Sequence, residues 1–168
     1  MSAVIESNHD DHHHGPAKGF SRWLYTTNHK DIGSMYLWFS LIMLFIGGAM
    51  AMVIRAELFE PGSQIVSPEF YNQMVTNHGL IMVFGVIMPA FVGFANWMIP
   101  MQIGAPDMAL PRLNNLSFWI LPAAFGILLS TFFMEGGAPS FGWTFYAPLS
   151  TEYAPPTVTF FIFSVHIM

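Results

Sequence analysis

Cysteine is absent from this 168-residue chain, and charged residues make up only 9% of it. The lack of cysteine excludes disulfide scaffolds, thiolate zinc sites, iron–sulfur clusters and cysteine nucleophiles, so a metal must be held by His, Met, Asp or Glu. Soluble domains carry about 25% charged residues, and 54% of this chain is hydrophobic. Only five Lys and Arg oppose ten Asp and Glu, which excludes the basic surface that nucleic-acid binding requires. The composition therefore indicates a membrane protein.

The spacing of the charges divides the chain into membrane spans. The uncharged interval 32–54 between Asp31 and Arg55 would be about 35 Å long as a helix, enough to cross a bilayer. A second helix is predicted at about 70–98 with a loop after it, and a third at about 115–134. Residues 157–168 are apolar but too few to cross, so they predict the start of a fourth span. Because a chain ending inside lipid would leave its last carbonyls without partners, we expect a longer protein.

Residues 1–21 form a polar tail, which its composition predicts to be disordered. Metal capture by its histidines is the alternative; these are His9, His12, His13 and His14. Basic residues flank the start of the first and third spans, and acidic residues predominate in the loops 55–69 and 135–156. The positive-inside rule therefore predicts a multi-pass protein with its N-terminus inside. The basic residues are Lys18, Arg22, Lys30 and Arg112.

His78 is the most informative single residue. It lies roughly 12–14 Å below the outer end of the second predicted span, within the hydrocarbon. An ionisable group at that depth needs a partner, a cavity or a ligand, and neutral imidazole is a good donor to haem iron and other metals. A hydrogen bond to a neighbouring helix explains it equally well. Gly85 and Gly93 follow on the same face and leave room beside the helix, although close helix packing is the better explanation for them.

Two other charged positions each have a structural and a functional explanation, and a third is a candidate for a cation site. Asp107 lies in a Pro- and Gly-rich loop, where a solvated surface charge is the commoner case, but a carboxylate there, with Asn96 and Asn114, would suit the mouth of a proton path. Arg55 ends the first span, where a guanidinium snorkels to the interface or pairs with an acidic cofactor group. Glu57, near a Pro-Gly turn, is a candidate ligand of a hard cation.

Long segments of the sequence resemble subunit I of the cytochrome c oxidases, in the haem-copper oxidase superfamily. The similarity runs from about Arg22 to the end of the chain. The motifs RAEL and APDMA resemble the branch of the superfamily that oxidises cytochrome c more than the branch that oxidises quinol. The matching segments, in order, are WLYTTNHKDIG, VIRAEL, TNHGLIMVFGVIMP, NWMIPMQIGAPDMALPRLNNLSFWILP and GWTFYAPL. The resemblance implies an all-α polytopic membrane bundle, of which residues 22–168 supply three complete spans and the start of a fourth out of twelve.

The resemblance also implies roles for particular residues. His78 matches an axial ligand of the low-spin haem a, and Arg55 matches the arginine that hydrogen-bonds its formyl group. Asp107 matches the entrance carboxylate of the D proton pathway, which Asn96 and Asn114 would line. Two further matches are peripheral: Trp143 corresponds to a tryptophan at the propionates of the high-spin haem, and Glu57 and Gly62, with Glu60 less securely, to a calcium or sodium site.

The resemblance implies the catalytic subunit of an aa3-type enzyme that passes electrons from cytochrome c to O₂, forms water and pumps protons across a bacterial plasma membrane. High-spin haem a3 and one copper would complete the cofactors, but their ligands match no residue of this chain. The expected partners are membrane lipid, a two-copper subunit that accepts the electrons and a third membrane subunit. A quinol oxidase is the nearest alternative. A haem-free scaffold or transporter, in which His78 only hydrogen-bonds a neighbour, is the alternative from another class.

Overall fold

The computed structural model describes residues 19–62 and 65–168, and throughout these residues the regular structure is helical, without a strand. The predicted histidine cluster and nearly all of the predicted tail lie outside the described residues, and Phe20 and Ser21 already belong to the first helix. The helices are α1 (Phe20–Tyr25), α2 (His29–Glu57), α3 (Pro68–Leu80), the π-helix η1 (Ile81–Ile87), α4 (Met88–Ile103), α5 (Pro111–Ser130), the 3₁₀ turn η2 (Thr131–Phe133) and α6 (Val158–Ile167).

The prediction of three complete spans is confirmed. Three continuous helical segments are long and apolar enough to cross a membrane: His29–Glu57, Pro68–Ile103 and Pro111–Phe133. The short apolar helix α6 begins one residue after the predicted start of the fourth span. The fold class, an all-α membrane bundle, therefore agrees with the sequence prediction.

The predicted end of the second span and the predicted start of the third were wrong by several residues, because local capping decides where a helix begins and stops. The second span continues past residue 98 to Ile103, with Pro100 inside it, and ends where Gly104 adopts a left-handed φ of 70°. The third begins at Pro111 rather than at residue 115, since proline suits the first turn of a helix. The 3₁₀ turn η2 continues the third span to Phe133, which agrees with its predicted end at about residue 134.

The second span changes its helical pitch where Pro89 approaches. Proline has no N–H and cannot make the usual bond to the residue four positions before it. Over Ile81–Ile87 the helix widens to a π-helix, and the Met88 N–H donates to Val83 O, five residues back. Pro89 then occupies the first turn of α4 and is fully buried. The span therefore accommodates Pro89 with a π-helical segment that precedes it.

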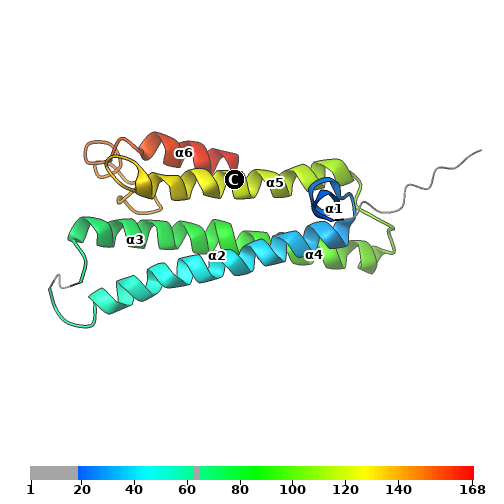
Figure 1. Ribbon diagram of the computed structural model, residues 1–168, viewed down its shortest axis with the longest axis horizontal. Helices are drawn as coiled ribbons and strands as arrows, with labels where there is room; N and C mark the ends of the chain where they lie inside the picture. The colour runs from blue at the N-terminus through cyan, green and yellow to red at the C-terminus, as the bar shows by residue number, and fades with distance from the viewer. Residues whose placement is uncertain (1–18, 63–64) are drawn as a thin grey trace, which may run out of the picture.

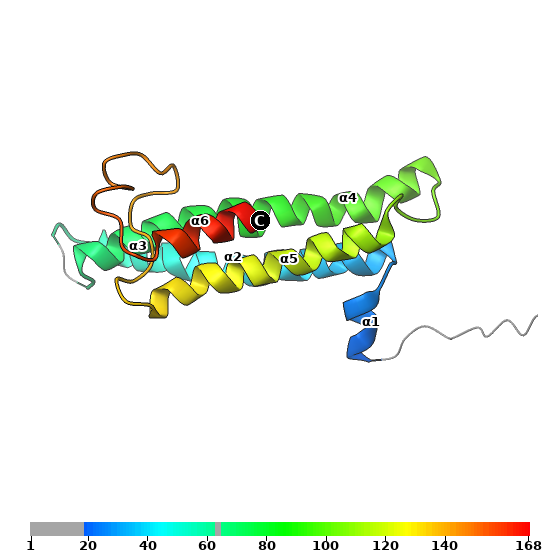
Figure 2. The ribbon, with the colours of Figure 1, turned by 90° about the horizontal axis from the view of Figure 1, so that it is seen from above.

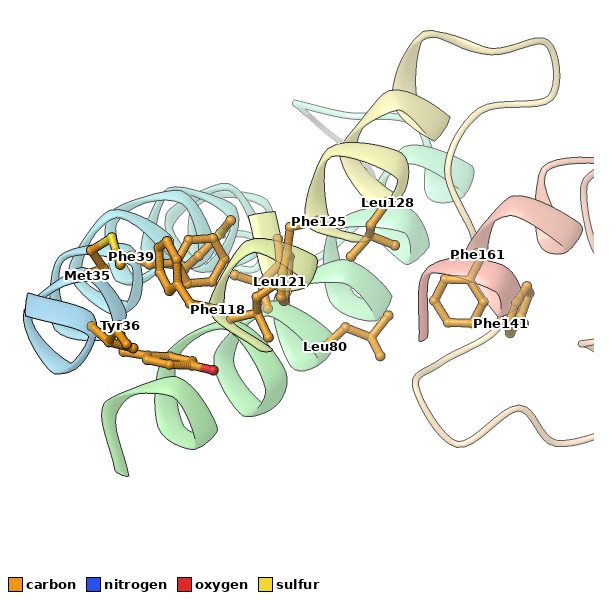
Figure 3. Close-up of a cluster of buried hydrophobic side chains, with 13 residues drawn as sticks. Met35, Tyr36, Phe39, Leu80, Phe118, Leu121, Phe125, Leu128, Phe141 and Phe161 are labelled. Carbon is orange, nitrogen blue, oxygen red and sulfur yellow. The ribbon is translucent and has the colours of Figure 1, made fainter. Parts of the chain in front are cut away.

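The long helices run side by side as an elongated bundle (Figures 1 and 2). α2 packs along α3, η1 and α4 and also contacts α5, while α5 packs against α6. The core cluster includes phenylalanines from α2, α5 and α6, and edge-to-face or tilted ring pairs such as Phe39 with Phe118 and Phe125 lie inside it (Figure 3). α2 and α4 approach most closely at Gly33 and Gly93, where a Cβ on either residue would lie 2.9 or 3.0 Å from the other's carbonyl oxygen.

The two ends of the bundle carry different charges, as the sequence predicted. α1 and the α4–α5 loop lie at one end, and the α2–α3 and η2–α6 connections lie at the other (Figures 1 and 2). At the first end Arg22 donates two hydrogen bonds to Asp31, at 2.8 and 3.2 Å, and ties α1 to α2. These bonds and the nearby negative charge raise the pKa of the Arg22 guanidinium. Arg55 lies near the opposite end of α2.

Candidate functional site

His78 is half-buried in α3, and its ring is fixed by a helix that lies far away in the sequence. Its Nδ1 lies 2.9 Å from the carbonyl oxygen of Gly47 in α2. Because a carbonyl only accepts, Nδ1 must carry the proton, and in the neutral imidazole the lone pair is then on Nε2. Histidines that bind metals have this arrangement, with the second nitrogen donating to a carbonyl that fixes the ring and its tautomer.

A hollow of about 470 Å³ lies beside His78 between α2 and α3. Arg55 lines it together with apolar side chains, which are Ala51, Ile54, Leu58 and Phe59. The structure therefore brings together the two residues that the sequence singled out for a haem. A predominantly apolar hollow with one nitrogen donor and one guanidinium has the composition of one side of a haem site.

The space beside Gly85 and Gly93 is filled by protein. A Cβ at Gly85 would lie 2.9 Å from Phe125 Cζ and 3.3 Å from Met43 Cβ, and one at Gly93 would lie 2.9 Å from Leu37 Cγ. These glycines allow close helix packing, as their structural explanation predicted. They leave no room for a planar ligand at that face, and the hollow beside His78 is instead the one that Arg55 lines.

Trp143 lies against the same turn of α3 that carries His78. Its Cδ1 would be 3.5 Å from a Cβ at Gly79, and its side chain is 48% exposed. The segment around it is anchored to α3, because Gly142 N donates to Thr76 Oγ1 and Asn77 Nδ2 donates to Pro139 O. His166 is separate from this group: its Nδ1 bonds Ile162 O of its own helix.

Glu57 is buried and organises the α2–α3 loop. Its Oε2 accepts the backbone N–H groups of Ile65 and Val66 at 2.8 and 2.9 Å. Gly62 is exposed, with a φ of 105°. Within residues 19–62 and 65–168, no three acidic, histidine or cysteine side chains gather as metal ligands. The predicted cation site thus contains a carboxylate that already binds backbone donors.

Asp107, at the opposite end of the bundle, is half-buried and bonded to the start of α2. Its Oδ1 accepts the backbone N–H of His29 at 3.2 Å and that of Met108 at 2.8 Å. A carboxylate at a helix N-terminus is favoured by the helix dipole. The carboxylate of Asp107 is therefore held by two backbone hydrogen bonds, which differs from the interpretation of Asp107 as a freely solvated surface charge.

Polar groups continue from Asp107 into the bundle. His29 is 6% exposed, and its Nδ1 lies 2.8 Å from Asn96 O. Asn114 Nδ2 donates to Asn96 Oδ1 at 2.6 Å. Ser117 Oγ donates to Asn114 O and lies 2.9 Å from the hydroxyl of Tyr36. We name these six residues, Asp107, His29, Asn96, Asn114, Ser117 and Tyr36, the polar string.

The sequence predicted three members of the polar string and missed the other three. His29, Tyr36 and Ser117 join residues on α2, α4 and α5 that are 67 to 81 positions apart in the chain. One signal was present, since His29 is an ionisable residue at the start of an apolar span, like His78 within the next one.

Comparison with known proteins identifies the family. Residues 31–168 match the family model described as cytochrome C and quinol oxidase polypeptide I. The chain belongs to this oxidase family. The match includes every residue that the sequence analysis assigned to a haem, to the proton path or to the cation site.

Individual relatives of the oxidase family agree with this assignment. Cytochrome c oxidase subunit 1 of Corynebacterium diphtheriae is 47% identical over 146 residues, which are 86% of this chain and 26% of the relative. Probable cytochrome c oxidase subunit 1-alpha of Streptomyces coelicolor is 47% identical over 143 residues, or 85% and 25%. The heme-copper oxidase subunit I+III of Aeropyrum pernix is 45% identical over 137 residues, or 82% and 17%. The chain thus spans about a quarter of the length of the first two relatives.

Proposed function

We propose that this chain is the first part of the catalytic subunit of a proton-pumping cytochrome c oxidase, with His78 as an axial ligand of the low-spin haem a. The observation that carries the proposal is the bond between His78 Nδ1 and Gly47 O, at 2.9 Å, which leaves Nε2 as the ligating nitrogen. The haem iron would supply one-electron transfer. The chain's own residues orient the ligand and exclude water from its apolar surroundings.

Arg55 and Trp143 would contact the haems from two sides. A guanidinium lining the hollow of His78 is suited to donate to the formyl group of haem a, and its fixed charge would draw electron density from the ring. Trp143 packs on Gly79, one residue from His78, and its indole N–H is suited to a propionate of the high-spin haem.

The polar string would deliver protons from the other end of the bundle. A carboxylate at the mouth attracts and passes on protons, and Asn96 and Asn114 would orient the first waters of a D-type pathway. His29 holds both ends of this entrance, because its backbone binds Asp107 and its ring binds Asn96. Because hydrocarbon conducts no protons, uptake from this end toward the haem end needs such groups or water.

The complete enzyme would reduce O₂ to water with electrons from cytochrome c, using haem a3 and copper held by residues other than those described. Its partners would include the two-copper subunit and the third membrane subunit, in a bacterial plasma membrane with the N-terminus inside. Glu57 and Gly62 remain the predicted calcium or sodium site, where a cation would have to share the Glu57 carboxylate with the loop N–H groups.

Substitution of His78 tests the haem assignment. In the intact oxidase, His78→Leu should remove the low-spin haem absorbance and leave helix content unchanged, because the side chain keeps its bulk and loses both nitrogens. His166→Leu is the matched control, since that histidine bonds only its own helix among the described contacts, and it should retain the full spectrum. A normal bis-histidine spectrum in His78→Leu would leave His78 as a helix-packing residue.

A further inference from the structure

A polar hollow of about 460 Å³ opens at the Asp107 end of the bundle, and its lining residues do not belong to the polar string. Tyr25, Thr26 and Thr27 line it from the segment between α1 and α2, and Arg112 and Asn115 line it from the first turns of α5. The hollow therefore has hydroxyl and amide groups, one guanidinium and no carboxylate.

Arg112 is the uncompensated charge of this hollow. Across residues 19–62 and 65–168 the one Lys or Arg that forms a salt bridge is Arg22, with Asp31. Lys30 lies over the Trp97 ring, on the side of α2 that faces α4. Arg112 thus presents a guanidinium at the membrane boundary without a protein counter-ion in the described structure, and an anion would complement it.

An apolar groove of about 350 Å³ adjoins this hollow along α2 and α5. α1, α2 and α5 supply its lining, which consists of Trp23, Met35, Trp38, Phe39, Ile42, Phe118 and Trp119. Asn115 lines the polar hollow and Trp119 lines the groove, and residues four apart lie one above the other on a helix. A polar site and an acyl-sized groove therefore follow one another along α5.

One residue of the polar hollow and one of the apolar groove each carry a buried hydrogen-bond donor without a partner. Asn115 Nδ2 and Trp119 Nε1 are both buried and have no acceptor among the described residues. Buried donors without acceptors are rare in folded proteins. The ester carbonyls of a glycerolipid, which lie just below the phosphate, are acceptors of the kind that these two donors lack.

We propose that this site binds an anionic phospholipid of the leaflet at the Asp107 end. Its phosphate pairs with Arg112, its ester carbonyls accept from Asn115 and Trp119, and one acyl chain lies in the groove. Trp23 and Tyr25 flank the site at the depth where aromatic residues anchor membrane proteins. The proposal needs only the membrane location of the chain, so it stands or fails independently of the haem and proton assignments.

Photo-crosslinking of the intact oxidase in nanodiscs tests this site. The probe is phosphatidylglycerol with a diazirine near the carboxyl end of one acyl chain, and the labelled peptide is located by mass spectrometry. We expect adducts on the α5 peptide that contains Trp119. Arg112→Gln should lower this labelling about fivefold, since one basic residue near an anionic surface contributes about that factor, and a zwitterionic phosphatidylcholine probe should label it less.

Lys30→Gln is the matched control, because it removes a positive charge from the same end without touching the groove, and its labelling should stay at the wild-type level. Retention of the oxidase spectrum in each variant shows that the protein is folded. The proposal is overturned if the α5 peptide is not labelled, which would mean that another protein segment covers the groove. It is also overturned if Arg112→Gln and wild type label equally, which would leave an unspecific annular lipid.

Discussion

The rings of His78 and His29 form the same kind of hydrogen bond, but the two residues lie at opposite ends of the bundle. Each Nδ1 lies within 2.9 Å of a backbone carbonyl of a neighbouring span, Gly47 O for His78 and Asn96 O for His29. A hydrogen bond of this kind fixes the tautomer and leaves Nε2 as an acceptor. Their neighbourhoods differ: His78 lines an apolar hollow with Arg55, whereas the backbone N–H of His29 donates to the carboxylate of Asp107 and its ring bonds the backbone oxygen of Asn96. The same side chain is therefore suited to ligation at one end and to a hydrogen-bonded proton path at the other.

Substitution of Arg55 tests its proposed contact with haem a. If its guanidinium donates to the formyl group of haem a, Arg55→Met should move the low-spin absorption band to shorter wavelength without loss of haem, because a charged donor no longer withdraws electron density from the ring. The measurement is the reduced-minus-oxidised spectrum of the purified oxidase. An unmoved band in a variant with full haem content would separate Arg55 from the haem.

At the scale of helices, the close approach of α2 and α4 holds the polar string together. Gly33 and Gly93 let the two backbones meet, and one turn further along α4, Asn96 reaches both His29 and Asn114. The π-helical turn η1 lies between this contact and His78 and adjusts the rotation of one half of the span relative to the other. Helix packing therefore determines how both functional ends are aligned.

Gly33→Ala tests the importance of this contact. The new Cβ would lie 2.7 Å from Trp97 Cδ1 and 2.9 Å from Gly93 O, and overpacking of this kind costs about 1–3 kcal/mol. Gly48→Ala on the same helix is the control, because a Cβ there meets nothing within 4 Å and alanine favours a helix by up to about 1 kcal/mol. Thermal unfolding should shift down for Gly33→Ala and stay level or rise for Gly48→Ala. Equal shifts would show that the glycine contact is not tight.

At the scale of the whole molecule, the sequence predicted the number of spans and their charged ends, because both depend on local composition. It singled out His78 and Arg55, which line one hollow in the structure, and the haem assignment that the family resemblance adds to them stays a prediction. It did not predict η1, the end of α4 or the start of α5, which depend on capping and on how the backbone accommodates Pro89. It also missed His29, Tyr36 and Ser117, since their partners are on other helices. Contacts between distant segments were the information that the sequence alone did not contain.

In the proposed function, proton uptake and haem ligation occupy opposite ends of one bundle. Asp107→Asn in the intact oxidase isolates the proton function. An amide oxygen can still accept from His29 N and Met108 N, so the shape of the loop is kept while the charge and the titratable proton are lost. Asp31→Asn is the control, because it removes a carboxylate at the same end that pairs with Arg22 and lies outside the polar string.

The most direct measurement is oxygen consumption recorded together with proton release from vesicles that contain the reconstituted oxidase. For Asp107→Asn, we expect unchanged haem spectra and haem reduction, no pumped protons, and turnover lowered at least about tenfold, since a positioned proton-transfer group contributes about 10²–10⁴-fold to a rate. Asp31→Asn should pump as wild type does. Normal turnover with normal pumping stoichiometry in Asp107→Asn would contradict the account and leave Asp107 as a carboxylate that only caps α2.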